Sequence, residues 1–405
     1  MPAAALRQRL ASLGGAAPGV ARTPPPGALP IGFDVIENDF GITFKRCSIE
    51  PMPAELAASP PRAFAYFDTE TSGLAGGTGT QIFAAAICQP VEGGLEVSQF
   101  FLRSPALEAA FLYAIGTALA RVGGVATYNG SRFDLPLLRT RWIMARLPGE
   151  LDHPPHQDLL TLTRALFRHR LPNCSLRSVE EEMLGLQRHQ DLPGALVPEA
   201  WFEYLRRGHS PNLEAALAHN RQDVVSLASL HLRIQQRLSG HERGLSSGDW
   251  LALARLLTRQ GRRADSWRSL RRAVQAGEGP AAALAGILLA RRLSRRGLPA
   301  AADQLLQALA RRLPDETELE LARARILEWR LGRPEAAREL VQRVLARQSP
   351  SSPYRADLEA RLARLQRRAA RAGQRRPALT AEPARALIPP RSQTSSWAGP
   401  IVSAD

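Results

Sequence analysis

The sequence predicts an α/β domain over residues 61–240, with a mixed sheet flanked by helices, and an all-α helical-repeat domain over residues 248–370. The chain has 405 residues, which exceeds one average domain. In the first region, short apolar strand patterns alternate with helical patterns, as in α/β folds. The second region is rich in Ala, Leu and Arg, and glycines that close helices recur about every 35 residues.

The composition favours a nucleic-acid partner. The formal net charge is +15 and the pI is about 11.1, which indicates a polyanionic partner, nucleic acid before membrane. Arginine supplies nearly all of this charge, since Lys45 is the single lysine, so a composition bias contributes as well. For the same reason, no glycine-rich turn in the sequence can supply the lysine of a P-loop.

Cysteine usage and hydropathy predict a soluble, cytoplasmic protein with no membrane partner. Cys47, Cys88 and Cys174 lie far apart in no metal-ligand spacing, which indicates reduced thiols. The first ten residues lack the layout of a signal peptide, and no run reaches the roughly 18 apolar residues that span a bilayer.

Residues 1–60 are expected to form an N-terminal extension. A short helix is predicted at Ala3–Leu13, and a glycine- and proline-rich link follows. The apolar–polar stretch Phe33–Cys47 contains Asp39-Phe40-Gly41, which predicts a small hairpin. This region carries no pattern that indicates chemistry.

The α/β domain is expected to begin with a strand at Ala63–Phe67 and a glycine-rich turn at Gly73–Thr80. A hairpin is expected next, because two strand patterns flank Pro90–Gly94. The later elements alternate between strand and helix. The expected ranges are strands Gln81–Gln89, Leu95–Leu102 and Gly124–Tyr128, helices Pro105–Arg121, Phe133–Arg146, Asp158–Phe167 and Ser175–Leu184, and a long helix that opens with Ser210 as N-cap and Pro211 at N1 and runs to about Leu238.

The helical region contains a repeat. Gly261, Gly297 and Gly332 each close a helix and precede a helix of small residues. Their spacing is that of tetratricopeptide-type helix–turn–helix repeats, and Pro353–Ala369 is expected to be a capping helix. A plain antiparallel helical bundle is the alternative. Residues 371–405 are rich in Arg, Pro and Ser without periodicity, which predicts a disordered tail.

Two carboxylates follow the first strand of the α/β domain. Asp68 and Glu70 stand at i and i+2, so both side chains leave the same face of the strand. Neighbouring anions repel each other unless a cation lies between them, and Mg²⁺ or Mn²⁺ prefers oxygen ligands. The alternative is a solvated strand end.

Two further segments carry acidic residues. Asn129-Gly130-Ser131-Arg132-Phe133-Asp134 lies where a strand turns into a helix, so Asp134 is expected in the first helical turn, with Asn129 holding the turn and Phe133 anchored in the core. His219 and Asp223 stand at i and i+4 of the last long helix and share a face. Each pattern alone is also common in a purely structural role.

Together, Asp68, Glu70, Asp134 and Asp223 place four carboxylates on three elements of one domain. Two divalent ions about 4 Å apart need that many carboxylates, and such a pair suits in-line hydrolysis of a phosphodiester. His219 is a candidate to accept the proton of the attacking water.

These segments resemble the DnaQ-like (DEDD) exonucleases of the ribonuclease H superfamily. The closer resemblance is to the YprB-type branch, in which a ribonuclease-H-like domain is often followed by tetratricopeptide repeats. It covers about Phe64–Leu232. It rests on Phe67–Leu74, Tyr128–Pro136 and His219–Val224, together with Ser175–Glu180 and Arg188–Gly194.

The resemblance implies that Asp68, Glu70, Asp134 and Asp223 bind two Mg²⁺ or Mn²⁺ ions and that His219 is the general base. One departure concerns His219, because three residues separate it from Asp223 where the His subclass usually has four. His219 is therefore also a candidate to orient water or phosphate.

Substrate contacts are predicted at Thr71, Asn129, Arg132 and Arg188, and Arg177 is a further candidate for phosphate. For the arginines, the alternative is solvated surface charge. His153, His156, Asp158 and His169 have no metal-ligand spacing, so they are not assigned to a metal.

The predicted function is metal-dependent hydrolysis of nucleic-acid phosphodiesters, DNA or RNA, in the 3′→5′ exonuclease direction that the resemblance implies. Two alternatives remain open. One is a nucleic-acid-binding scaffold whose repeats recruit a protein partner without catalysis, and the other is a structure-specific endonuclease.

Overall fold

The computed structural model describes residues 27–52, 64–73, 77–148, 154–188, 192–240, 242, 244–277 and 279–374. The predicted helix Ala3–Leu13 and almost all of the predicted tail lie outside these residues. The chain divides into two compact units, Met1–Arg292 and Leu293–Asp405.

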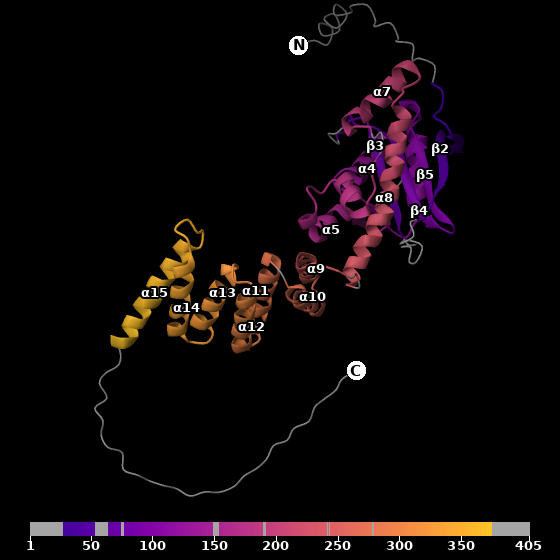
Figure 1. Cartoon of the computed structure of the whole chain (residues 1–405). Coiled ribbons are helices and arrows are strands. Elements are labelled where there is room, and N and C mark those ends of the chain that lie inside the picture. Colours follow the sequence, from indigo (N-terminus) through magenta and orange to yellow (C-terminus); the bar gives the residue numbers. More distant parts are fainter. Residues whose placement is uncertain are drawn as a thin grey trace, which may run out of the picture. The chain divides into compact units, whose positions relative to one another are not determined.

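A seven-stranded mixed sheet in the order β1-β2-β5-β4-β3-β6-β7 forms the centre of the first unit (Figure 1). The neighbouring strands β1, β2, β5, β4 and β3 pair antiparallel in this order. Strands β6 and β7 continue the sheet beyond β3 and run parallel to it. Their bounds are β1 Asp34–Asn38, β2 Gly41–Glu50, β3 Ala65–Thr71, β4 Ile82–Val91, β5 Gly94–Phe101, β6 Val125–Thr127 and β7 His156–Asp158.

The predicted hairpin around Asp39 is present, but it does not stand apart from the α/β domain. Its second strand, β2, pairs with β5 along seven residue pairs, so the hairpin extends the sheet. Phe44 of β2 is buried and belongs to the same apolar core as Phe67, Phe83 and Phe101. Hydrophobic burial therefore ties this part of residues 1–60 to the domain.

The helices from the sheet region through residue 239 are α3 Glu108–Leu119, α4 Asp134–Met144, α5 Leu159–Leu166, α6 Leu176–Val179, α7 Val197–Arg207 and α8 Leu213–Ser239, with single 3₁₀ turns at Pro105–Leu107, Arg168–Arg170 and Gly194–Leu196. The predicted helix Ser175–Leu184 is split, because a π-helical turn at Glu180–Leu184 follows α6. Helix α8 packs against β3, β4 and β5, and α3 packs against β1, β2 and β5.

The predicted start of the long helix is wrong by a few residues. Helix α8 begins at Leu213, and Ser210 and Pro211 form the turn before it. The Ser210 hydroxyl accepts a hydrogen bond from the Asn212 backbone at 3.3 Å, so it stabilises this turn instead of capping the helix.

The remaining helices are α9 Ser247–Arg259, α10 Arg263–Ala276, α11 Gly279–Arg295, α12 Pro299–Arg312, α13 Thr317–Trp329, α14 Pro334–Arg347 and α15 Arg355–Gln374. Gly261, Gly297 and Gly332 close helices with φ values of 76°, 80° and 63°, a left-handed conformation that glycine adopts at low cost. This region is helical, as predicted, and consistent with a helical-repeat domain.

The division between the two units falls inside α11, well beyond the predicted linker between residues 240 and 248. Helix α9 packs against α5. Its buried Asp249 receives hydrogen bonds from Arg237 of α8 and from Arg170. These contacts join α9 and α10 to the first unit.

Among the described residues, no helix combines the length and the apolar character that crossing a membrane requires.

Candidate active site

The end of β3 carries Asp68 and Glu70. Asn220 of α8, fully buried, donates through Nδ2 to Asp68 Oδ2 at 2.9 Å and to the Asp68 carbonyl at 3.2 Å. Gln99 of β5 in turn donates to Asn220 Oδ1 at 3.2 Å and to the Leu217 carbonyl at 2.8 Å. The amide of Asn220 is thereby fixed with its donor toward Asp68. Sequence reasoning missed Asn220, although it lies within the segment that carries His219 and Asp223.

Asp134 lies in the first turn of α4, as predicted, and is buried. Its Oδ1 accepts hydrogen bonds from the Thr69 hydroxyl at 2.5 Å and the Thr69 backbone at 3.2 Å. Thr69 lies between Asp68 and Glu70, so the strand that carries the first two acids also positions the third.

The turn before Asp134 is held by Asp158 at the end of β7. Asp158 accepts from the Asn129 backbone at 2.9 Å and from the Ser131 hydroxyl at 2.5 Å, and it also caps α5. Asn129 has a φ of 68°, and a Cβ at Gly130 would lie 2.4 Å from Thr127 Oγ1, so the turn needs both residue types. Asp158 is a positioning residue that the sequence pattern did not reveal.

Phe133 corrects the sequence expectation. Its side chain is 49% exposed, so it does not anchor the turn in the core. Asp158 anchors the turn by hydrogen bonds instead.

Asp223 and His219 of α8 meet Arg188. Arg188 Nη2 donates to Asp223 Oδ1 at 2.5 Å, and Nη1 lies 2.9 Å from His219 Nδ1. The other side of the guanidinium is held by Glu180, whose fully buried carboxylate accepts at 2.5 and 2.7 Å. Ser226 of α8 also donates to Glu180, at 2.5 Å. Arg188 is therefore a fixed cation beside Asp223.

This contact decides the tautomer of neutral His219. Arg188 Nη1 lies 2.9 Å from Nδ1 and 3.5 Å from Nε2 of His219. A guanidinium can only donate, so we assign the nearer Nδ1 as the acceptor and the ring proton of neutral His219 to Nε2. His219 Nε2 lies 3.8 Å from Asp223 Oδ2. In this arrangement, Nε2 is a hydrogen-bond donor.

The electrostatics couple the acids to one another. Burial raises the pKa of Asp68 well above its ordinary value, and the negative charges of Asp223 and Asp134 raise it further. Glu70 adds a smaller repulsion. Burial raises the pKa of Asp134 to about 6, although hydrogen bonds from Thr69 oppose the shift. Burial also raises the pKa of Asp223, while His219 and Arg188 oppose the shift. Acids on β3, α4 and α8 thus all act on the pKa of Asp68.

The residues fit a divalent cation by their chemistry. Mutual repulsion among these buried and half-buried carboxylates disfavours their ionised forms, and a cation would remove that penalty. Yet no three His, Cys, Asp or Glu side chains within the described ranges are placed as a ready-made metal group. Thr69, Asn220 and Arg188 each hold one acid by hydrogen bonds, so the carboxylates must reorient to share an ion.

The residues predicted to contact substrate differ in their availability. Arg132 is exposed, one residue before Phe133. Thr71 donates to the Gly73 carbonyl at 2.9 Å, and Asn129 shapes its turn. Arg188 is only 8% exposed and is engaged with three side chains, so it does not offer an open phosphate contact. Arg177 is exposed and pairs with Glu181.

Comparisons with known proteins match the part of the chain that carries the candidate site. Residues 65–235 match a family described as RNase_H superfamily. A curated relative from Bacillus subtilis (strain 168), named "Uncharacterized protein YprB", is 38% identical over 175 residues. That alignment covers 43% of this chain and 42% of the relative, so the chain spans less than half of the relative's length.

Among solved structures, the chain resembles a family B DNA polymerase from the hyperthermophilic archaeon Pyrobaculum calidifontis. The identity is 14% and the TM-score is 0.35, with 76% of this chain and 46% of that chain covered. The mixed sheet, its flanking helices and the family match together identify residues 65–235 as a ribonuclease-H-like domain.

Proposed function

We propose that the first unit is a metal-dependent nuclease that hydrolyses nucleic-acid phosphodiesters. One observation carries this proposal. The negative charges of Asp223, Asp134 and Glu70 all raise the pKa of Asp68, within a ribonuclease-H-like domain, and this coupling supports a site shared by the four acids. A protein that only bound a polyanion would gain nothing from clustered negative charge.

Asp68, Glu70, Asp134 and Asp223 would hold the two Mg²⁺ or Mn²⁺ ions. When bound, such ions activate water and stabilise the leaving oxygen of a phosphodiester. The protein's own residues orient the acids: Asn220 directs Asp68, Thr69 directs Asp134, and Arg188 directs Asp223.

We assign His219 to the reacting water or to a phosphate oxygen. While Arg188 donates to Nδ1, His219 can donate from Nε2. The general-base role expected from the sequence requires Arg188 to release Nδ1, so that Nε2 becomes the acceptor. Arg132, Asn129 and Thr71 remain proposed substrate contacts.

The 3′→5′ exonuclease polarity is part of the proposal and is supported by the resemblance of the three motifs.

We further propose that the C-terminal helices are tetratricopeptide-like repeats that bind a protein partner, with domain bounds of 61–240 and 248–370. The glycines with positive φ at the expected spacing support a repeat.

The test is hydrolysis of 5′-labelled DNA and RNA oligonucleotides, single- and double-stranded, with Mg²⁺, with Mn²⁺ and with a chelator. We expect stepwise shortening from the 3′ end that the chelator abolishes. Asp134→Asn should abolish it as well, whereas Asp39→Asn, in the exposed turn between β1 and β2, should not. Cleavage of a circular single strand, which has no end, would show endonuclease activity and contradict the proposed exonuclease.

A second candidate function is a nucleic-acid-binding scaffold without catalysis. The observation that favours it is Arg188, which neutralises Asp223 in place of a metal ion. Tight binding of oligonucleotides that is indifferent to Mg²⁺ and Mn²⁺, with no hydrolysis of any substrate, would establish this alternative.

A further inference from the structure

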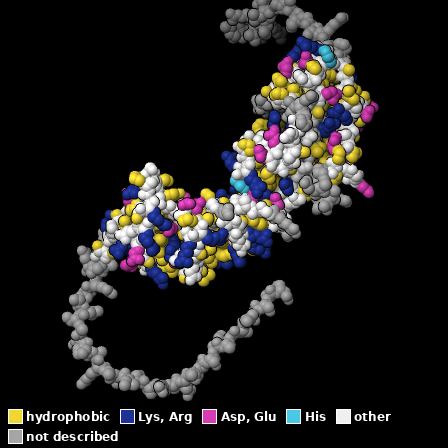
Figure 2. All heavy atoms as spheres, in the orientation of Figure 1, with side chains coloured by type: hydrophobic (Ala, Val, Ile, Leu, Met, Phe, Trp, Pro, Cys, Tyr) yellow, Lys and Arg dark blue, Asp and Glu magenta, His cyan; other side chains and the backbone are white. Residues whose placement is uncertain are grey.

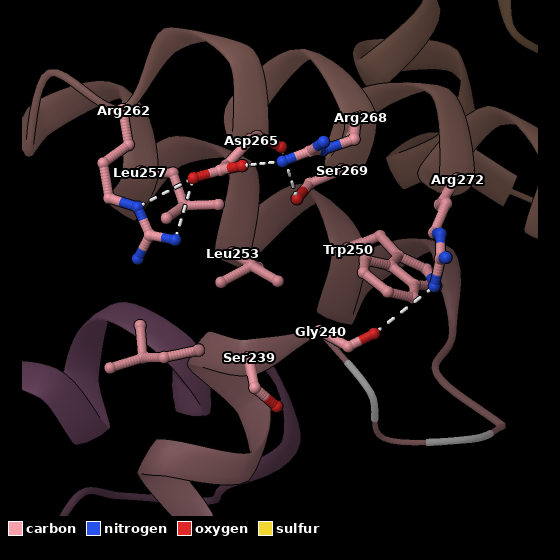
Figure 3. A pocket seen from close by; sticks show the side chains of 11 residues that line it. Ser239, Gly240, Trp250, Leu253, Leu257, Arg262, Asp265, Arg268, Ser269 and Arg272 are labelled. Atoms are coloured by element: carbon pink, nitrogen blue, oxygen red, sulfur yellow. Dashed lines mark hydrogen bonds and ion pairs between the residues drawn. The ribbon is translucent and has the colours of Figure 1, made fainter. Parts of the chain in front are cut away.

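A cavity of about 440 Å³ lies where the end of α8 meets α9 and α10, away from the candidate active site (Figure 3). Its volume lies within the range of small-molecule and cofactor pockets. Leu253, Leu257 and Trp250 of α9 form part of its apolar lining and are themselves buried. The openly accessible part of the cavity is therefore its polar wall on α10.

Three arginines line this wall, namely Arg268 and Arg272 of α10 and Arg262, the N-cap residue before it. Arg268 and Arg272 are one helical turn apart, about 6 Å along the axis, so they present two cations side by side. Arg272 lies over the Trp250 ring at 4.8 Å and donates to the Gly240 carbonyl at 3.3 Å (Figure 3). Figure 2 shows Lys and Arg side chains gathered over the part of the surface where α10 lies.

Among the described residues that line the cavity, Asp265 carries the one carboxylate that opposes these cations. Asp265 accepts from Arg262 Nε at 2.9 Å and also from Arg268 (Figure 3). One carboxylate cannot neutralise three guanidinium groups, so the wall keeps a net positive charge. Arg262 and Arg268 are both well exposed, and their bonds to Asp265 can be exchanged for bonds to another anion at little cost.

Helix α8 connects this cavity to the candidate active site. Asn220 meets Asp68 and His231 meets Tyr66 at 3.2 Å, so α8 runs antiparallel to β3. The fifteen residue steps from Asp223 to Leu238 span about 22 Å along the helix axis. That distance corresponds to about six nucleotides of a stacked single strand.

We propose that this cavity, which we call the α10 pocket, binds the phosphates of the substrate strand several nucleotides away from the end that is hydrolysed. The inference rests on the proposed function. Arginines at this spacing on one wall match a ligand with repeated negative charges, and a nucleic-acid strand is the polyanion that the adjacent domain would handle. The pocket sets a length preference without contacting the reacting bond.

The test compares Arg268→Gln and Arg262→Gln with a matched control, Arg271→Gln. Arg271 is exposed on the same helix and carries the same charge, but it does not line the pocket. Binding of a labelled 15-nucleotide single strand is measured with Ca²⁺ across a salt series. Each pocket variant should lower the slope of log affinity against log salt by about 0.7, with about tenfold weaker binding. The control variant Arg271→Gln should reduce the salt slope and the affinity by smaller amounts.

Asp265→Asn should have the opposite effect and tighten binding, because it removes the carboxylate that competes for Arg262 and Arg268. Gains and losses in the same pocket cannot both come from misfolding, and thermal unfolding of each variant checks this directly. Binding that is unchanged in the pocket variants, or weakened equally by Arg271→Gln, would overturn the proposal.

Hydrolysis of short substrates separates this proposal from the proposed function. Oligonucleotides below about six nucleotides do not reach the pocket. The pocket variants should therefore degrade them at the normal rate and lose activity only on longer strands. If no substrate is hydrolysed by the unaltered protein, the binding measurements still decide whether the pocket holds a strand.

Discussion

The candidate active site and the junction between α8 and α9 both contain buried carboxylates, but their surroundings differ. At the junction, Asp249 meets Arg237 Nη1 at 2.7 Å and His169 Nε2 at 3.1 Å, and it forms a capping box with Ser246. Burial alone would raise the pKa of Asp249, but hydrogen bonds from His169, Arg170 and Ser246 hold it well below its ordinary value.

At the candidate site the balance is reversed. Burial raises the pKa of Asp68, the neighbouring acids raise it further, and the amide of Asn220 opposes the shift. The comparison teaches that burial alone does not mark a functional acid. An acid that is surrounded by hydrogen-bond donors stabilises the fold. Acids that face one another are stable in their ionised forms only when a cation lies near them, and the surrounding side chains do not supply enough positive charge for this.

The largest expected effect is at Asp68. Asp68→Asn should reduce hydrolysis about a thousandfold, or about 4 kcal/mol, because a proposed ligand loses its charge. Without metal, the same change should leave the melting temperature equal or higher, because repulsion is relieved. Rate measurements and thermal unfolding in a chelator check both parts, and a lowered melting temperature would contradict the contrast with Asp249.

Asp249→Asn should have the converse effect. It leaves buried Arg237 without its charged partner at this position, which should lower the free energy of unfolding by about 3 to 5 kcal/mol. Hydrolysis of short substrates, measured well below the melting temperature, should persist. Denaturant unfolding gives the stability, and a loss of activity in a fully folded Asp249→Asn protein would show that the junction also serves the site.

Arg188 contacts both kinds of acid, because it binds the donor-held Glu180 and the candidate-site residue Asp223. Arg188→Gln should cost about 2 to 3 kcal/mol of stability, because fully buried Glu180 loses both of its guanidinium bonds. Combining it with Glu180→Gln should restore part of this loss.

The same variant reports on His219. With Arg188 present, neutral His219 should carry its proton on Nε2, which ¹⁵N chemical shifts of labelled histidine can identify. The double variant should lose this fixed tautomer. A proton on Nδ1 in the unaltered protein would refute the proposed contact and favour the general-base role.

The smallest expected effect is the dependence of stability on pH. The folded-state pKa of Asp134 is raised to about 6, so its contribution to stability is present at low pH and is lost as the pH rises through about 6. Between pH 4 and pH 7 in a chelator, this loss should be about 2 kcal/mol. It should be smaller in Asp134→Asn, in which only the raised pKa values of Asp68 and Asp223 still contribute. Asp249 acts with the opposite sign, because its lowered pKa means that its stabilisation is lost only in strong acid. Stability that rises between pH 4 and pH 7 without metal would contradict the raised pKa of Asp134.

Much of the fold followed from local sequence patterns. The hairpin around Asp39, the strand before Asp68 and the helices after residue 248 all appear where periodicity and turn residues predict them. The start of α8 did not, because the Ser210 hydroxyl bonds within the preceding turn. The prediction that Phe133 is anchored in the core was also wrong. Nothing in a local sequence pattern distinguishes an aromatic residue in a core from an exposed one beside a site.

The sequence by itself determined which acids could act together. The alternation of strand side chains, the i and i+4 geometry of a helix and the position of Asp134 at a helix start are local properties, set by backbone geometry. They suffice to name Asp68, Glu70, Asp134 and Asp223 as candidates.

Only the tertiary structure decided what surrounds each acid. Asn220 reaches Asp68 across 152 residues of sequence, and Arg188 reaches Asp223 across 35. The addition of β2 to the sheet and the attachment of α9 to α5 are likewise long-range contacts. Burial and pKa depend on charges summed over neighbours in space, and no local pattern encodes that sum.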